Sequence, residues 1–206
     1  MVVSRLNVED RPVERYVILL RGLMPTGKNK VLMAPLRAAL EGSGLMDVHT
    51  YIQSGNILAT SALGQADLEQ HVHVVIADSF GGDIPVLART VAQFRTIVAN
   101  IPFSHSDPAS LYVTLLASRP DSRVVEEFLA PGYDPDVVAV IGDVVYLRCA
   151  SSHRASKVTN TVIERKLKVA ATTRVSTTIA RLAALSGEQP AGAAEKTHAA
   201  TADSAE

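Results

Sequence analysis

The chain has 206 residues, 47% of them hydrophobic, with a formal net charge of −1 and a single cysteine. The length allows one or two domains with packed cores, the near-zero charge argues against a broad nucleic-acid-binding surface, and one cysteine cannot build a disulfide framework within one chain. Because no apolar run approaches the ~20 residues that span a bilayer and the N-terminus lacks a secretory signal, we expect a cytoplasmic protein without membrane segments.

Apolar periodicity predicts strand–helix–strand–strand–helix–strand order over residues 15–102, after a polar N-terminus (1–14) that we expect to be flexible. The expected elements, in chain order, are a strand over 16–20, a helix over 33–40, strands over 48–53 and 57–60, a helix over 68–80, a strand over 84–88 and a short trailing helix over 91–99.

The same order begins again after a joint rich in Pro, Ser and Asp. The expected elements are a strand over 111–116, a helix over 124–129, a hairpin over 137–141 and 144–149, a helix over 158–167, a strand over 170–175 and a helix over 179–185. The repeated order predicts an α+β protein of two ferredoxin-like βαββαβ halves in tandem, 15–102 and 110–186, with mixed or antiparallel sheets and helices packed on them. We expect a ligand cleft between the halves and a disordered tail over 187–206.

The strand over 16–20 ends in Arg21, and a loop with glycine, proline and two lysines follows. An arginine at the carboxyl end of a strand can bind phosphate, or can form a salt bridge with an acidic neighbour. Gly27 lets the loop backbone approach an anion, and Lys28 and Lys30 can neutralise a polyphosphate or remain solvated. Asn29 stands where a Walker loop requires Ser or Thr, so this is not that motif.

Two later segments carry further hydrogen-bonding groups. The turn over 53–56 can contact a ligand or can serve only as a turn. The segment over 156–160 opens a helix, and a lysine there opposes the helix dipole unless an anion is bound. A Thr-Thr-Arg sequence over 172–174 ends a strand in the second half. The candidate cofactor-binding residues of these segments are Ser54, Asn56, Lys157, Thr159, Asn160 and Arg174.

Acidic residues accumulate over 120–145, where they either form a solvated face or receive a cationic substrate. Asp134, Asp136 and Asp143 are the substrate-binding candidates of this stretch. Glu164 is a candidate metal ligand, on the basis of charge alone. His153, in a basic loop, is the candidate proton-transfer group.

Taken together, the motifs of this chain resemble a bacterial family of uncharacterised proteins, domain of unknown function 1697. They are YVILLRG at 16–22, GKNKV at 27–31, TYIQSGN at 50–56, SKVTN at 156–160 and ATTR at 171–174. The resemblance covers residues 15–185 and implies two ferredoxin-like halves. The chain departs from the family in having a single glycine in the loop over 25–27, and in having Val-Ser-Thr over 175–177 where the family has Asn-Trp-Asn, which favours a specialised substrate.

Three functions remain open from the residues. In the first, the basic residues surround ATP or GTP with Mg²⁺, and a phosphoryl or nucleotidyl group is transferred to a hydroxyl of a small polar, cationic substrate such as an aminosugar antibiotic. In the second, the same residues make a non-catalytic sensor or adaptor that binds a nucleotide or a small anion. The third, RNA binding, lacks the aromatic sheet positions of an RNA-recognition module.

Overall fold

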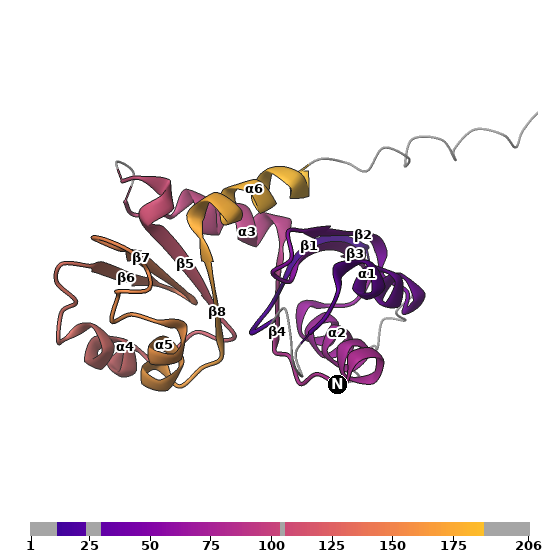
Figure 1. The fold of residues 1–206 in the computed structure, drawn as a ribbon, viewed down its shortest axis with the longest axis horizontal. Helices are drawn as coiled ribbons and strands as arrows, with labels where there is room; N and C mark the ends of the chain where they lie inside the picture. The colour runs from indigo at the N-terminus through magenta and orange to yellow at the C-terminus, as the bar shows by residue number, and fades with distance from the viewer. Residues whose placement is uncertain (1–11, 24–29, 104–105, 188–206) are drawn as a thin grey trace, which may run out of the picture.

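Two four-stranded antiparallel sheets, one from each half of the chain, form the computed structural model, which describes residues 12–23, 30–103 and 106–187 (Figure 1). The first half contains β1 (Glu14–Leu20), α1 (Met33–Gly42), β2 (Met46–Tyr51), β3 (Asn56–Ser61), α2 (Gln65–Phe80), β4 (Val86–Thr90) and α3 (Val91–Ala99). Its strand order is β2-β3-β1-β4.

The second half repeats this arrangement. It contains the short helix η2 (Pro108–Ser110), then β5 (Leu111–Leu116), α4 (Ser122–Leu129), β6 (Val137–Ile141), β7 (Val144–Arg148), α5 (Asn160–Leu167), β8 (Ala171–Val175) and α6 (Ser176–Gly187). Its strand order, β6-β7-β5-β8, is equivalent to that of the first sheet. The predicted α+β class with two βαββαβ halves is therefore confirmed.

Some boundaries differ from the prediction. β1 already begins at Glu14, and the strand expected over 84–88 lies over Val86–Thr90. Ile84 is fully buried, which explains the misplacement, but the following Pro85 has no N–H to contribute to a strand ladder. Residues 1–11 of the expected flexible N-terminus (1–14) and residues 188–206 of the expected tail (187–206) lie outside the described residues, whereas Glu14 belongs to β1 and Gly187 to α6. Within the described ranges, no helix has the length and hydrophobicity needed to cross a membrane.

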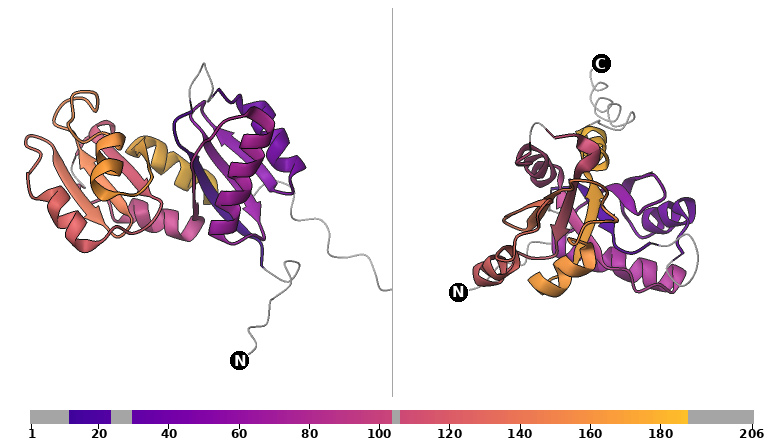
Figure 2. Two further views of the ribbon diagram at one scale, coloured as in Figure 1. Left: turned by 90° about the horizontal axis from the view of Figure 1, so that it is seen from below. Right: turned by 60° about the vertical axis from the view of Figure 1, so that its left-hand side comes forward.

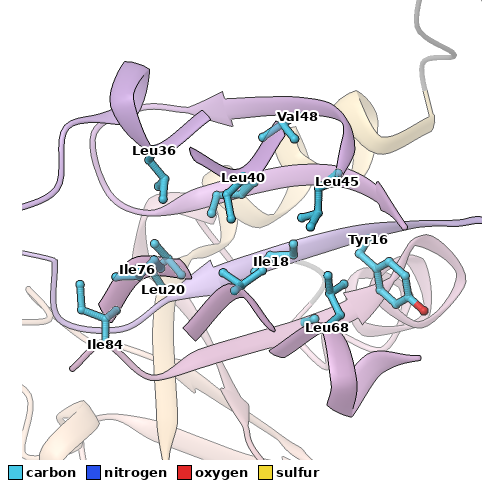
Figure 3. Close-up of a cluster of buried hydrophobic side chains, with 14 of the residues drawn as sticks. Tyr16, Ile18, Leu20, Leu36, Leu40, Leu45, Val48, Leu68, Ile76 and Ile84 are labelled. Carbon is cyan, nitrogen blue, oxygen red and sulfur yellow. The ribbon is translucent and has the colours of Figure 1, made fainter. Parts of the chain in front are cut away.

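β1 is buried on both faces because its side chains alternate between two apolar clusters. Tyr16, Ile18 and Leu20 point toward the helices α1 and α2 and form the core of the first half, part of which is drawn in Figure 3. Val17 and Leu19 point to the opposite face of the sheet, where the second cluster begins.

The second cluster joins the two halves. α3 and α6 lie together between the two lobes (Figures 1 and 2), and their side chains Phe94 and Ile179 are fully buried against apolar residues from both sheets. This cluster includes Leu58 on β3 and Val113 on β5. The sheet faces that an RNA-recognition module leaves open for bases are therefore packed against α3 and α6 in this protein.

Candidate functional site

Arg174, on β8, reaches from the second half into the first. Its Nε donates to Asn56 Oδ1 at 2.7 Å, and its Nη2 donates to the carbonyl oxygens of Leu20 at 2.8 Å and Ser54 at 2.9 Å. The end of β1 and the turn between β2 and β3 are thereby tied to β8. Three of the predicted segments, distant in the sequence, meet at this point.

The remaining two donors of Arg174 bind within β8. Nη1 donates to Thr172 Oγ1 and to the carbonyl oxygen of Thr173, both at 2.9 Å. A guanidinium has five N–H groups, and all five are now used. Burial lowers the pKa of Arg174 to about 10, which still leaves the side chain charged at neutral pH. A phosphate could bind Arg174 only by displacing protein groups, so its evident task is to hold the halves together.

The turn that receives Arg174 is itself fixed. Asn56 Nδ2 donates to Ser54 Oγ at 2.8 Å, and Leu20 N–H donates to the Gly55 carbonyl at 2.8 Å. Gly55 has φ of +71°, and a Cβ placed there would lie 2.7 Å from the Cβ of Leu20. Glycine is therefore required for both backbone conformation and close approach. The polar groups of Ser54 and Asn56 serve this turn and its contact with Arg174.

Arg21 lies beside this junction but is differently placed. Its Nη2 donates to Glu164 Oε2 on α5, and 35% of its side chain is exposed. Its Nε is buried and has no hydrogen-bond partner among the described residues. Unlike Arg174, Arg21 has a hydrogen-bond donor that no described residue accepts from.

Glu164 orients Arg21 and also braces β8, because its Oε1 accepts the Ala171 N–H at 2.9 Å. Each carboxylate oxygen thus accepts one hydrogen bond from a protein group, and the predicted role of Glu164 as a metal ligand stays a prediction. In the described part of the chain, no group of three or more His, Cys, Asp or Glu side chains is arranged to hold a metal ion.

The other predicted residues lie near the start of α5 and have different roles. Thr159 caps the helix by accepting the Val162 N–H at 3.3 Å. Asn160 binds Ala171 O and Thr173 Oγ1, both at 3.0 Å, and so joins α5 to β8. Lys157, only three residues earlier, is exposed and lines a separate cavity.

The loop after Arg21 is only partly described. The predicted residues Gly27, Lys28 and Asn29 lie outside the described residues, whereas Lys30 is exposed. The chain beyond Lys30 is held by Gln53, whose Nε2 donates to Val31 O at 3.0 Å. Gln53 therefore links the turn between β2 and β3 to the approach to α1.

The three acidic candidates separate into two places. Asp134 and Asp136 line the same cavity as Lys157. Asp143, at the other end of the β6–β7 hairpin, accepts a hydrogen bond at 2.6 Å from Arg89. The cavity of about 660 Å³ therefore carries two of the three predicted carboxylates.

Arg89, on β4, is a buried residue that the sequence did not single out. Only 2% of it is exposed, and its guanidinium donates to Asp143 Oδ2 and to the Leu116 carbonyl, both at 2.6 Å. Glu69 Oε1 lies 3.8 Å from its Nη1. Arg89 is a second link from the first half to the second, and the available signal was a charged residue within an apolar strand.

His153 stacks on Tyr112 with ring centroids 4.3 Å apart, and its Nε2 is buried with no hydrogen-bond partner among the described residues. Burial lowers its pKa below the ordinary value of 6.5, and the charge of Asp136 opposes this shift. His153 is thus neutral at neutral pH. The ring of His153 packs on Tyr112, whereas Arg21 binds Glu164, so these two candidates have different partners.

The lowered pKa of His153 predicts a loss of stability at acid pH. As the pH falls through 6.5, the unfolded chain takes up a proton before the folded chain does, so unfolding becomes easier. The H153F variant keeps a ring for stacking and removes the titration. In denaturant titrations at several pH values, we expect the stability of wild type relative to H153F to fall as the pH drops below 6.5. A difference that stays constant with pH would contradict this assignment.

Comparison with known proteins agrees with this fold. A family model described as protein of unknown function (DUF1697) matches residues 13–146. The conserved bacterial protein SP0830 from Streptococcus pneumoniae is similar in structure, with a TM-score of 0.66 and 23% sequence identity, over 85% of this chain and 99% of that one. A search of curated proteins found no significant match. The SKVTN and ATTR segments lie beyond the range that the family model matches, and the likeness to SP0830 concerns the fold alone.

Proposed function

The chain belongs to the DUF1697 family of proteins of unknown function, and we propose that it binds a phosphate-bearing small molecule, a nucleoside triphosphate in the first instance, at the carboxyl end of β1. The observation that supports this proposal is the guanidinium of Arg21. It is partly exposed at the junction of the two halves, and its buried Nε has no partner among the described residues.

The surroundings of Arg21 suit an anion. Gly22, with φ of +71°, turns the backbone away from the strand immediately after Arg21, and Lys30 contributes an exposed positive charge at the end of the same loop. Arginine binds phosphate oxygens with geometrically fixed donors. Glu164 weakens anion binding through its charge, but it also fixes the guanidinium before a ligand arrives.

Arg174 supports such a site without entering it. By binding the Leu20 carbonyl it fixes the residue immediately before Arg21, and by binding the turn over 54–56 it fixes the neighbouring backbone. Arg21 and the adjacent backbone are then already ordered before the ligand binds, so that less binding free energy is lost in ordering them. In this proposal the two arginines have separate tasks, one structural and one in ligand contact.

A thermal-stability titration tests the proposal. ATP, GTP and inorganic phosphate, each with and without Mg²⁺, are added to wild type and to R21Q. A ligand that binds only the folded state raises the melting temperature with its concentration. Because a charge-assisted hydrogen bond contributes about 1.5–3 kcal/mol, we expect R21Q to bind the stabilising ligand at least about tenfold more weakly.

The matched control is R123Q, which removes the same charge from a side chain of α4 that is 84% exposed. This variant should bind the ligand as wild type does. The proposal fails if none of the three compounds stabilises wild type, or if R21Q and R123Q respond alike.

A transferase is the second candidate, favoured by the separate cavity that Asp134, Asp136 and Lys157 line. In that case the phosphate-bearing ligand is the donor and the cavity receives the hydroxyl substrate, and the donor must extend from Arg21 into this cavity for its phosphorus to be attacked by the hydroxyl. Wild type would be incubated with nucleotide, Mg²⁺ and a panel of amino-hydroxyl compounds, followed by mass spectrometry of the compounds. A mass gain of one phosphoryl or nucleotidyl group supports the transferase; unchanged masses together with nucleotide stabilisation support a non-catalytic binding protein.

A further inference from the structure

We propose that the cavity between α4, β6 and the segment preceding α5 binds a small zwitterion, with the ammonium end at Asp134 and Asp136 and the anionic end at Lys157. This inference does not depend on the phosphate site at Arg21, and it gives the cavity a ligand class whether or not the protein is a transferase. It rests on the size of the cavity, on the opposite charges of its walls and on the unused capacity of those charges.

The cavity has the dimensions and walls of a small-molecule site. Its volume of about 660 Å³ lies within the range of about 300–1,000 Å³ that is typical of such sites. Leu129 and Val138 give it apolar surface, and Tyr133 contributes an aromatic ring. The Tyr133 hydroxyl donates to the Phe128 carbonyl at 2.7 Å, which fixes the ring in place.

The charged side chains that line the cavity form few hydrogen bonds or ion pairs with other residues of the protein. Asp134 and Lys157 form no hydrogen bond or ion pair with another described residue. Asp136 Oδ1 accepts the Ala150 N–H at 2.9 Å, which leaves Oδ2 for another donor. Carboxylates and an ammonium therefore line one cavity without forming an ion pair with one another.

This arrangement selects for charge at both ends of a ligand. A protonated amine gains from two carboxylates and from contact with the Tyr133 ring. A carboxylate or phosphate gains from Lys157. A molecule with only one of these groups gains from one wall and leaves the opposite, exposed charge to water, so a zwitterion is expected to bind better than either half of it.

The test uses three compounds of equal chain length: aminohexanoate, hexylamine and hexanoate. Binding to the full-length protein is measured by ligand-detected NMR titration. We expect aminohexanoate to bind more tightly than the other two, by up to about fivefold, since a partly exposed ion pair contributes up to about 1 kcal/mol. D134N should bind aminohexanoate no better than hexanoate, and K157Q should bind it no better than hexylamine.

The control is D78N, which neutralises an exposed carboxylate on α2 in the other half of the protein and should leave the preference for aminohexanoate unchanged. R21Q should also retain it, which separates this site from the phosphate site. The proposal is overturned if aminohexanoate binds no better than the singly charged compounds, if none of the three binds, or if D78N reduces binding as much as D134N does.

Discussion

The R174M variant is expected to lose about 3–5 kcal/mol of unfolding free energy, because removing one partner from a buried polar network leaves the other partners unsatisfied. The methionine side chain would keep most of the apolar stem but would leave Asn56 Oδ1 and the carbonyl oxygens of Leu20 and Ser54 without their hydrogen-bond donor. These acceptors lie between the two halves, where the substitution provides no replacement donors. Chemical denaturation of wild type and R174M measures the effect.

Two further variants identify the cause. R174K retains the charge but has three donors on one nitrogen instead of five in a plane, so we expect a smaller but clear loss of stability. R181Q, an exposed charge change on α6, should differ little from wild type. Equal stability of R174M and R181Q would show that Arg174 does not hold the halves together.

The R89M variant is expected to lose about 3 kcal/mol of unfolding free energy for a related reason. Removing the Arg89 guanidinium leaves a carboxylate and a carbonyl without their donor. Arg89 is 2% exposed and binds Asp143 and the Leu116 carbonyl across the junction. D143N tests the ion pair separately. It keeps an oxygen that can accept from Arg89 but removes the charge, so its loss of stability should be smaller.

Denaturation monitored by circular dichroism measures both variants against R123Q, which alters an exposed arginine on α4. A larger loss in D143N than in R89M would mean that the charge of Asp143, and not the donors of Arg89, dominates this contact.

The order of the strands and helices was predictable because the apolar period changes between two and 3.6 residues along the chain. The cluster that joins the halves was not predictable. Val17 and Leu19 alternate along β1 with residues that belong to the core of the first half, and the apolar pattern does not indicate what covers the second face of the sheet. α3 and α6, expected as trailing helices, cover it.

The segments that form the junction were predictable as motifs, but their tasks were not. Arg174 binds backbone carbonyls of residues 154 and 120 positions away, and no sequence pattern indicates that a carbonyl oxygen will face a given side chain. From the sequence alone, an arginine at the end of a strand whose donors bind protein groups cannot be distinguished from one whose donors have no protein partner. Burial and hydrogen bonding distinguish Arg174 from Arg21.

The acidic stretch shows how a linear charge pattern can separate in space. Asp136 precedes β6 and Asp143 lies in the turn that follows it, so five extended residues, roughly 17 Å, stand between them. Asp136 then lines the cavity with Lys157, and Asp143 binds Arg89. Because Asp136 and Asp143 are close in the sequence, they were predicted to share one substrate site. The β6–β7 hairpin instead places them in two different environments.

The division of tasks between the two arginines is most directly tested by NMR of their Nε–H groups in protein labelled with ¹⁵N, during titration with the phosphate ligand that stabilises wild type. We expect the Arg21 resonance to shift saturably and the Arg174 resonance, hydrogen-bonded to Asn56, to stay in place. A saturable shift of Arg174 with no change at Arg21 would contradict the account.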